Sequence, residues 1–455
     1  MAIERSVYSC KTALLDAATL IGLPIIFLFL FLISIASRLQ QRHTDRSRLM
    51  WGPAPIINNP YWARAMREAG YHSESYTENF AATLNGRSDY DRLVTDDIPA
   101  WIPLKIRAFL AFSISILRYD YFFFSFEGGF LGSTKLWWLE SFLIRVANKK
   151  VAILCFGGDV FIYNRVRSIS RLYGLVAYAP KGSVKQREIA KKVDYWVENA
   201  DCILPGFAFA DGLGRLDMLA YCVLCIDTNA WTPSKRASYA DGINGAVRIA
   251  HAPNSRGGKG SRYIIKAVET LKREGLKVEL VLIEGAQNAQ VKKILSTDVD
   301  ILAEQLILIG YGLNGMEGMA SGLPVIANLE DEDYFSPLRR WSYFDECPVV
   351  SATPENITET LRTLVLNPSL RHLLGAAGRN FVEKYHSNEA TVFLFEAIIK
   401  YMDGSRESML NFCDPEIGEF PNRLPLISHP LIRGKIQASE QAANQTTASY
   451  ESIAF

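Results

Sequence analysis

Apolar residues are distributed along this chain in two different ways. Residues 17–37 form one continuous, mostly apolar segment without a charged side chain. A helix of this length rises about 30 Å, which is the thickness of the hydrocarbon core of a bilayer. The segment therefore predicts an N-terminal transmembrane helix, and residues 1–50 are expected to form a membrane anchor with a juxtamembrane linker.

The charges on either side of this segment predict its orientation. Lysine and arginine before it are Arg5 and Lys11, and those after it are Arg38, Arg42, Arg46 and Arg48. Since the more positive side stays in the cytoplasm, a single-pass protein with cytoplasmic catalytic domains is expected. A cleaved signal peptide is the alternative, because residues 34–36 resemble a small-residue cleavage site. The apolar segment is, however, longer than the usual core of such a peptide.

Beyond the anchor, short apolar runs alternate with helical patterns. The expected strands are 119–126, 149–156 and 221–228 in a first series, and 246–253, 277–285, 301–310 and 323–329 in a second. Between them, apolar residues recur every three to four positions, as in the expected helices 104–117 and 261–275. Strands that alternate with helices predict parallel sheets covered on both faces. The fold class is therefore α/β, with doubly wound, Rossmann-like domains.

A polar stretch at 232–245 separates the two series and predicts a hinge. We therefore expect an N-terminal domain at 51–240 and a C-terminal domain at 241–402, the latter ending in two or three helices. The two domains are expected to face a cleft, with the ligand outside the carboxyl ends of the strands. Residues 403–455 become weakly patterned and predict a tail that is partly disordered.

Composition excludes some classes of function. The chain has 455 residues with 49 Lys and Arg against 48 Asp and Glu, so its net charge is +1. Without a basic surplus, a protein that coats nucleic acid is disfavoured, and no nucleic-acid partner is expected. The seven cysteines are scattered and odd in number, which argues against a disulfide scaffold and for a reducing compartment.

The segment His251–Gly260, HAPNSRGGKG, follows an expected strand and precedes an expected helix. Its glycines permit close approach of a ligand to the backbone, and the start of the helix presents free N–H groups. Lys259 and Arg256 add positive charge, so we predict binding of a phosphate or diphosphate. A glycine-rich surface turn with a solvated lysine is the alternative. His251 is either a site residue that faces the cleft or a structural histidine.

A second glycine-rich segment, GYGLNGMEGMASGLPVIA, covers residues 310–327. It places Glu317 on a short helix whose first amides belong to residues near Gly312 and Leu313. A carboxylate at such a position accepts two ribose hydroxyls, while the amides bind phosphate oxygens. The pattern predicts a nucleotide-sugar site. The alternative is that Glu317 is a solvated residue that only favours the helix dipole.

These segments resemble a known family. KG…IIKAVETLK, VELVLIEG, DILAEQL and GYGLNGMEGMASGLPVIAN together resemble the C-terminal half of family-4-like glycosyltransferases with the GT-B fold. LLGAAGRNFVEKYHSNEA, at 373–390, resembles the helix that closes those proteins. The resemblance covers about 110–402 and is stronger in the C-terminal half. It implies an N-terminal acceptor domain, a C-terminal donor domain, and retaining transfer from a nucleotide-diphosphate sugar without a metal or other cofactor.

The resemblance also implies roles for single residues. Glu317 matches the acid of the family's E-x7-E motif that binds the nucleotide ribose, whereas Ile309 stands in place of the first acid. Lys259 matches the lysine that contacts the diphosphate. The family's partner arginine falls on Asn254, and Arg256 is its expected substitute.

In the N-terminal half, Gly157, Gly158 and Asp159 resemble the glycine loop that lies near the donor phosphates and the acceptor. Glu127 follows an expected strand directly and is expected to line the cleft as a further catalytic residue. The helix 104–117 is apolar on most faces. It is either part of the core or an interfacial surface beside a lipid acceptor, which the aromatic residues at 137–142 would extend.

The expected function is a membrane-anchored glycosyltransferase that uses a glycan or lipid-linked acceptor in exopolysaccharide or other polysaccharide biosynthesis. The alternative is a non-catalytic GT-B scaffold or regulatory partner in a polysaccharide-assembly complex. The apolar residue Ile309, at the position of the first motif acid, favours this alternative.

Overall fold

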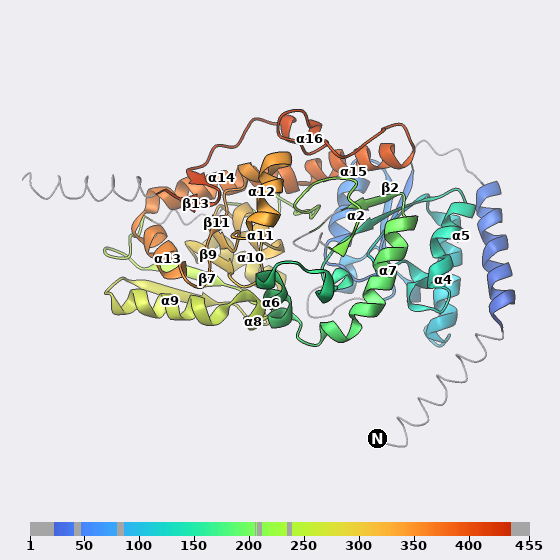
Figure 1. Ribbon diagram of the computed structural model, residues 1–455, viewed down its shortest axis with the longest axis horizontal. Coiled ribbons are helices and arrows are strands. Elements are labelled where there is room, and N and C mark those ends of the chain that lie inside the picture. The colour runs from blue at the N-terminus through green and yellow to red at the C-terminus, as the bar shows by residue number, and fades with distance from the viewer. Residues whose placement is uncertain are drawn as a thin grey trace, which may run out of the picture.

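The computed structural model describes residues 22–40, 47–79, 86–204, 206, 212–233 and 239–437. These residues form two α/β domains, each built on a sheet whose paired strands are all parallel (Figure 1). Two facing Rossmann-like domains are the arrangement that the resemblance to GT-B proteins implies, and this part of the prediction is confirmed.

The N-terminal sheet has the strand order β3-β2-β1-β4-β5-β6. Its strands are β1 Arg48–Trp51, β2 His72–Thr77, β3 Arg92–Leu93, β4 Tyr121–Phe124, β5 Lys150–Leu154 and β6 Cys202–Leu204. The α-helices of this half are α2 Asn59–Glu68, α3 Val94–Asp97, α4 Leu104–Arg118, α5 Glu140–Val146, α6 Ile169–Tyr178 and α7 Gln186–Asn199. The strand order reverses between β1 and β4, as in dinucleotide-binding folds.

The C-terminal sheet has the strand order β11-β10-β9-β7-β8, so its order reverses between β7 and β9. Its strands are β7 Val247–His251, β8 Val278–Leu282, β9 Ile301–Gln305, β10 Val325–Ala327 and β11 Val350–Ser351. The helices are α8 Arg256–Lys259, α9 Ser261–Arg273, α10 Asn288–Thr297, α11 Leu313–Ala320, α12 Glu332–Trp341, α13 Ile357–Leu366 and α14 Pro368–His386. Ligands of doubly wound sheets bind at such a reversal point, beyond the carboxyl ends of the strands.

The chain returns from the C-terminal to the N-terminal domain through α15, Asn388–Met402 (Figure 1). Phe395 of this helix packs edge-on against Trp51, with 4.7 Å between the ring centroids. The Tyr121 hydroxyl donates a hydrogen bond to Asp403, just beyond the helix. Aromatic burial and this polar contact hold α15 against the N-terminal domain and so join the two domains.

The segment beyond α15 remains ordered to residue 437. It contains α16 Glu419–Asn422 and the antiparallel strands β12 Leu431–Ile432 and β13 Lys435–Ile436. The Ser351 amide of β11 donates a hydrogen bond to the Gly434 carbonyl of the hairpin that joins β12 and β13. Part of the predicted tail therefore packs on the C-terminal domain, whereas residues 438–455 lie outside the described residues.

Two local predictions differ from the structure. The first strand begins at Arg48, inside the segment expected to be a linker. The expected strand 221–228 does not form. Its apolar residues are buried between the domains, and its backbone groups bond to side chains instead of a neighbouring strand: Asn58 bonds to the Cys225 amide and carbonyl, and Trp62 donates to the Val223 carbonyl. Burial alone accounts for its apolar pattern.

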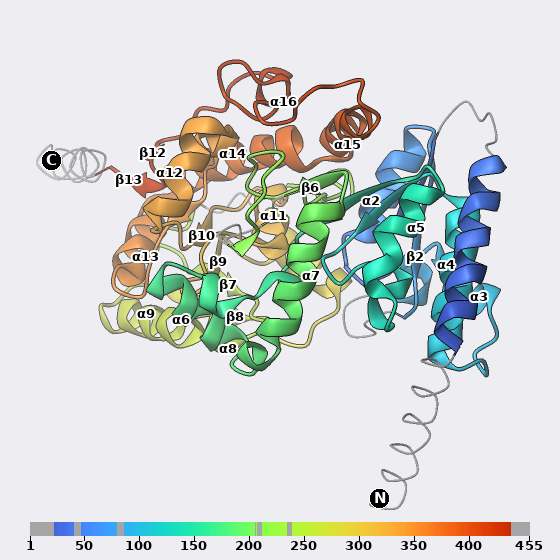
Figure 2. The ribbon, with the colours of Figure 1, turned by 45° about the vertical axis from the view of Figure 1, so that its right-hand side comes forward.

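The N-terminal apolar segment forms the helix Gly22–Leu39, with a mean hydropathy of 2.2. One face packs beside α4 and α5 (Figure 2): the Ser37 hydroxyl donates to the Ile116 carbonyl, and Phe31 stacks on Phe142. Only 17% of the helix is buried, so it is not a core helix of the domain. Signal sequences share its length and composition. The flanking Arg5, Lys11, Arg42 and Arg46 lie outside the described residues.

Candidate functional site

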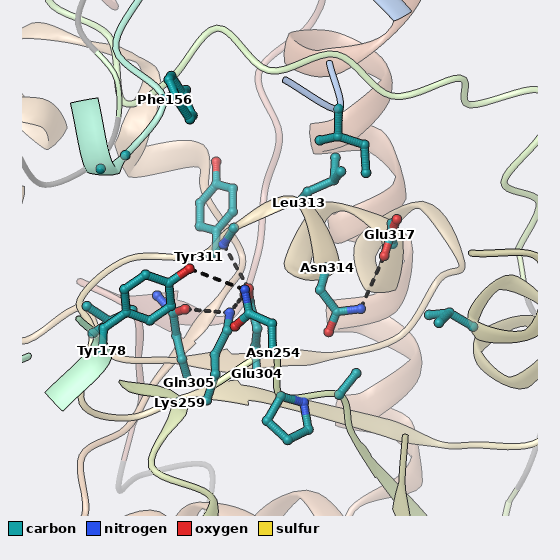
Figure 3. A pocket seen from close by; sticks show the side chains of 18 of the residues that line it. Phe156, Tyr178, Asn254, Lys259, Glu304, Gln305, Tyr311, Leu313, Asn314 and Glu317 are labelled. Carbon is teal, nitrogen blue, oxygen red and sulfur yellow. Dashed lines mark hydrogen bonds and ion pairs between the residues drawn. The ribbon is translucent and has the colours of Figure 1, made fainter. Parts of the chain in front are cut away.

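A cavity of about 870 Å³ lies between the two domains. Its C-terminal wall is formed by the loops that follow β7, β8 and β9 and by the start of α11, and its N-terminal wall by the loop after β5 and by α6. The cavity therefore occupies the reversal point of the C-terminal sheet, where the fold places ligands. Figure 3 shows the side chains around it.

Lys259, at the end of α8, reaches this cavity. Its ammonium group donates to Glu304 Oε1 at 3.0 Å and to Gln305 Oε1 at 2.7 Å. Both partners come from the last two residues of β9. The lysine that the sequence predicts for a diphosphate thus lies in the cavity, already paired with a buried carboxylate (Figure 3).

Glu304 also accepts a hydrogen bond from the amide of Gly312, the N-cap residue of α11. The Gly312 N–H donates to Glu304 Oε1 at 2.8 Å. The second oxygen, Oε2, is buried and has no hydrogen-bond partner among the described residues. Since the side chain of Glu304 is 0% exposed, its carboxylate is held inside the protein, against the N-terminal end of α11.

Glu317 lies on the second turn of α11 and is also buried. Asn288 donates to its Oε1 at 3.3 Å and Asn314 to its Oε2 at 3.2 Å. The pKa of Glu317 is raised to about 7, first by burial and then by the charge of the nearby Glu304, against the hydrogen bonds from the two asparagines and the charge of Lys259, which lower it. The alternative of a solvated residue is therefore wrong: Glu317 is an oriented carboxyl group inside the cavity wall.

The N-terminal domain contributes the glycine loop after β5. Gly157 and Gly158 line the cavity, and a Cβ atom added at either would meet nothing within 4 Å. Asp159 is buried instead of lining the cavity, and it accepts hydrogen bonds from the amides of Gly157 and Phe126. Burial raises the pKa of Asp159 to about 7. This residue therefore fixes the loop, while the two glycines leave open space for a ligand.

Helix α6 of the N-terminal domain packs on the glycine-rich turn of α8. A Cβ at Gly258 would lie 2.8 Å from the Tyr178 ring, and one at Gly257 would lie 2.8 Å from the Ala177 carbonyl oxygen. These two glycines, which the sequence suggested for close approach of a phosphate, allow close approach of α6. The Gly258 amide donates to the Ser255 hydroxyl.

An ion pair joins the domains at the same place. Arg171 of α6 lies 2.9 Å from Asp331, the N-cap of α12, and their side chains are only 6% and 8% exposed. Arg171 lines the cavity and also lies over the Tyr334 ring. Among the described lining residues, the cations are Arg171 and Lys259 and the anions are Glu304 and Glu317. Each of these cations is already paired with a carboxylate before any ligand enters, Arg171 with Asp331 and Lys259 with Glu304.

Other predicted residues lie at the cavity wall or nearby. Asn254 and Leu313 line the cavity, as does Gly312. His251, the last residue of β7, is buried. Its Nδ1 bonds to the Ala303 carbonyl of β9 at 2.7 Å and its Nε2 to Ser261 of α9 at 2.8 Å. Burial lowers its pKa to about 4. Since a carbonyl oxygen only accepts, Nδ1 carries the proton. His251 is therefore the structural histidine of the two alternatives.

Two expected catalytic residues lie outside the cavity. Arg256 makes a bidentate pair with Glu284 on the surface, and its side chain is 57% exposed. It points to this partner because α8 presents its first residue to solvent and its last residue, Lys259, to the cavity. Glu127 is exposed and is not among the lining residues. Its loop after β4 folds away, over Glu140, which accepts from the Gly129 and Leu131 amides.

The sequence reasoning missed several polar residues of the cavity, among them Arg171, Asn288, Glu304 and Gln305. A signal existed for two of them, because Glu304 and Gln305 are polar residues at the carboxyl end of a buried strand, at the reversal point of the sheet. No pattern in the sequence places Arg171 or Asn288 beside them. In the part of the chain that the structure describes, no group of three or more His, Cys, Asp or Glu residues has the arrangement of a metal site.

Comparison with known proteins finds similarity only among solved structures. No family model matches the sequence, and no curated protein matches it. Anabaena Alr3699/HepE, solved in complex with UDP, has 10% identity and a TM-score of 0.49 over 78% of this chain and 99% of its own. S. aureus MnaA, solved with UDP, has 12% identity and a TM-score of 0.40 over 78% and 97%. AviGT4, a glycosyltransferase involved in avilamycin A biosynthesis, has 13% identity and a TM-score of 0.38 over 78% and 97%. These values assign no family, so the functional argument rests on the cavity itself.

Proposed function

We propose that the protein is a retaining glycosyltransferase that moves a sugar from a nucleotide-diphosphate sugar to a glycan or lipid-linked acceptor, without a metal ion. The observation that supports this most strongly is the content of one inter-domain cavity. It places the ammonium of Lys259, the start of α11 and the carboxyl group of Glu317 together at the reversal point of a doubly wound sheet.

The chemistry of this cavity suits a nucleotide-diphosphate sugar. The Glu317 carboxyl, oriented by two asparagine amides, accepts the ribose hydroxyls. Lys259 and the amides at the start of α11 lie where the diphosphate would be bound and would stabilise the negative charge that develops on it as the sugar leaves. The glycines of the loop after β5 leave space for the sugar and its acceptor on the opposite wall. Enclosure between the domains limits access of water and therefore hydrolysis of the donor.

We also propose that the helix Gly22–Leu39 attaches the protein to a membrane. The face that is not packed on the N-terminal domain is apolar, with Ile25, Leu28, Phe29 and Leu32 all exposed. Such a face is stable against a bilayer and costly in water. Attachment of the domains to the cytoplasmic face suits an acceptor on a lipid carrier, as in assembly of a surface polysaccharide.

The test is donor hydrolysis and sugar transfer by the purified full-length protein. We expect Lys259→Ala to reduce kcat/KM by about 100-fold or more, because removal of one preorganised group that stabilises transition-state charge has effects of this size. Glu317→Ala should also reduce kcat/KM, mainly through a higher KM, because it removes the carboxyl group that accepts the ribose hydroxyls. Lys272→Ala, on the exposed side of α9, is the matched control and should retain activity. Full activity of both cavity variants would refute the assignment of the site.

A non-catalytic nucleotide-binding scaffold in a polysaccharide-assembly complex is the second candidate. The observation in its favour is that Lys259 and Arg171 are both paired with carboxylates. Calorimetry that shows binding of a sugar nucleotide, together with neither hydrolysis nor transfer, would support the scaffold. Turnover of the donor would exclude it.

A further inference from the structure

The Lys259–Glu304 pair has an unusual geometry for a structural ion pair. One oxygen of the Glu304 carboxylate, Oε1, accepts two hydrogen bonds: one from the Lys259 ammonium and one from the Gly312 amide. The other oxygen, Oε2, receives none within the described part of the chain and is shielded from solvent. A buried carboxylate oxygen that accepts no hydrogen bond lowers the stability of the folded protein. The carboxylate of Glu304 is therefore bound in the site with only one of its two oxygens hydrogen-bonded.

The protein is also shaped around this carboxylate. Helix α11 begins next to it, and a Cβ atom at Gly315 would collide with Oε2, while one at Gly312 would lie 3.1 Å from Oε1. The two glycines therefore create the space that the carboxylate occupies. Its donors, an ammonium group and the first amide of a helix N-terminus, are those that bind phosphate groups.

We propose that Glu304 is an internal counter-ion that determines which ligands the cavity binds: a phosphate group takes Lys259 and the Gly312 amide only as Glu304 gives them up. This inference rests on the proposed function and adds a specificity-determining residue to it. The phosphates of an incoming ligand must compete with a carboxylate that is already in place. Glu304 therefore reduces the affinity that each phosphate group of a ligand gains from Lys259 and the Gly312 amide.

The alternative role for Glu304 is direct contact with a ligand hydroxyl, and the two roles predict opposite results. If Glu304 competes with phosphate, the neutral and nearly isosteric Glu304→Gln leaves Lys259 without a counter-ion and strengthens binding of phosphate ligands. If Glu304 contacts a hydroxyl of the ligand, the same substitution weakens binding. The gain from competition must also depend on the number of phosphates, since a ligand without phosphate has no charge to place against Lys259.

The experiment measures the affinity of uridine, UMP, UDP and inorganic pyrophosphate for the full-length protein by calorimetry. For Glu304→Gln we expect at least tenfold tighter binding of UDP and of pyrophosphate and an unchanged affinity for uridine. Glu284→Gln is the matched control, because it removes a carboxylate that pairs with Arg256 outside the cavity and should change none of the four affinities. Weaker or unchanged binding of UDP by Glu304→Gln would overturn the inference.

A second measurement needs only the wild-type protein and remains informative if Glu304→Gln does not fold. With Lys259 neutralised, each added phosphate in the series uridine, UMP and UDP should strengthen binding by less than tenfold. A larger step per phosphate would overturn the counter-ion role.

Lys259→Met separates this result from failure of the proposed function. If UDP binds the wild type and this variant abolishes binding, the site stands whatever the sign of the Glu304 effect. If the wild type binds none of the four probes, the proposed function itself fails.

Discussion

At the scale of single residues, burial decides the chemistry of this site. Glu317 and Glu304 are acidic residues that would be solvated and ionised on a surface, but both lie inside the cavity wall. Desolvation disfavours the charged form of a carboxyl group, and a second carboxylate nearby adds to this effect. The pKa of Glu317 therefore rises to about 7, although two asparagines donate hydrogen bonds to it. A perturbed acid in a cavity is a typical feature of a functional site.

The raised pKa of Glu317 predicts how stability depends on pH. In the unfolded chain this carboxyl has a pKa of 4.5, and in the folded protein of about 7. Between these values the folded state binds the proton that the unfolded state has released, so the contribution of Glu317 to the free energy of unfolding falls as pH rises from 4.5 to 7. Glutamine does not titrate, so the Glu317→Gln variant does not lose stability in this way as the pH rises. Relative to the wild type, the variant should gain stability across this range by at most about 3 kcal/mol.

The measurement is the free energy of unfolding of both proteins in urea at several pH values between 4 and 8. The substitution also alters the hydrogen bonds to Asn288 and Asn314, which shifts the stability of the variant at every pH. The informative quantity is therefore how the difference in free energy of unfolding between the variant and the wild type changes with pH. Glu284→Gln should leave the shape of the wild-type curve unchanged above about pH 5, because pairing with Arg256 lowers the pKa of Glu284 and its titration lies below this range. Curves for Glu317→Gln and wild type that stay parallel over the whole range would contradict the prediction.

At the scale of secondary-structure elements, the contact between α6 and α8 joins the two walls of the cavity. Gly257 and Gly258 allow the helices to approach closely, and the buried ion pair between Arg171 and Asp331 links α6 to the start of α12. Removal of one member of a buried pair leaves the other charge without its partner in a site of low dielectric constant. The junction therefore depends on both charges.

We expect Arg171→Met to lower the free energy of unfolding by about 3 kcal/mol, a size typical of a broken buried pair. The variant should also weaken UDP binding, because α6 forms part of the cavity wall. Urea unfolding and calorimetry measure the two effects. Arg256→Met, which breaks a bidentate pair on the surface, is the matched control and should be close to the wild type in stability. Equal stability of both variants would show that the inter-domain pair is dispensable.

At the scale of the whole molecule, three features describe how the cavity and the N-terminal helix are arranged. Loops from both domains line one cavity, α15 crosses back to the N-terminal domain, and the helix Gly22–Leu39 lies along the far side of that domain (Figure 2). The helix is next to α4 and α5, which belong to the domain expected to hold the acceptor. A membrane along this helix would therefore lie beside the acceptor domain.

Membrane attachment through this helix predicts the effect of charges on its exposed face. Phe29→Lys together with Leu32→Lys should move the protein from the sedimented vesicle fraction to the supernatant, because a lysine within a bilayer costs about 3 kcal/mol. Co-sedimentation with lipid vesicles measures this. Leu426→Lys, at an exposed apolar residue beyond α16, is the control and should sediment as the wild type does. If the double variant still sediments fully, the helix is not the site of attachment.

Local sequence patterns were sufficient to predict most of the elements of this protein. Periodicity is a local property, and it correctly predicted the strands β4, β5 and β7 to β10; it predicted two or three helices at the end of the C-terminal domain, where the structure has three, α13 to α15. The two glycine-rich motifs and the resemblance to family-4-like glycosyltransferases, and not periodicity, predicted that Lys259 and Glu317 bind one ligand; both residues line the same cavity. Local pattern failed at 221–228, where an apolar run reports burial between domains and no strand forms.

Only the tertiary structure decided which way the charged side chains point and what they meet. Arg256 and Lys259 are three residues apart, yet one pairs with Glu284 in solvent and the other with Glu304 in the cavity. Arg171 reaches the same cavity from the other domain. Ion pairing and burial depend on distances between residues far apart in the chain, and these distances are set only when the two domains have folded and packed against each other.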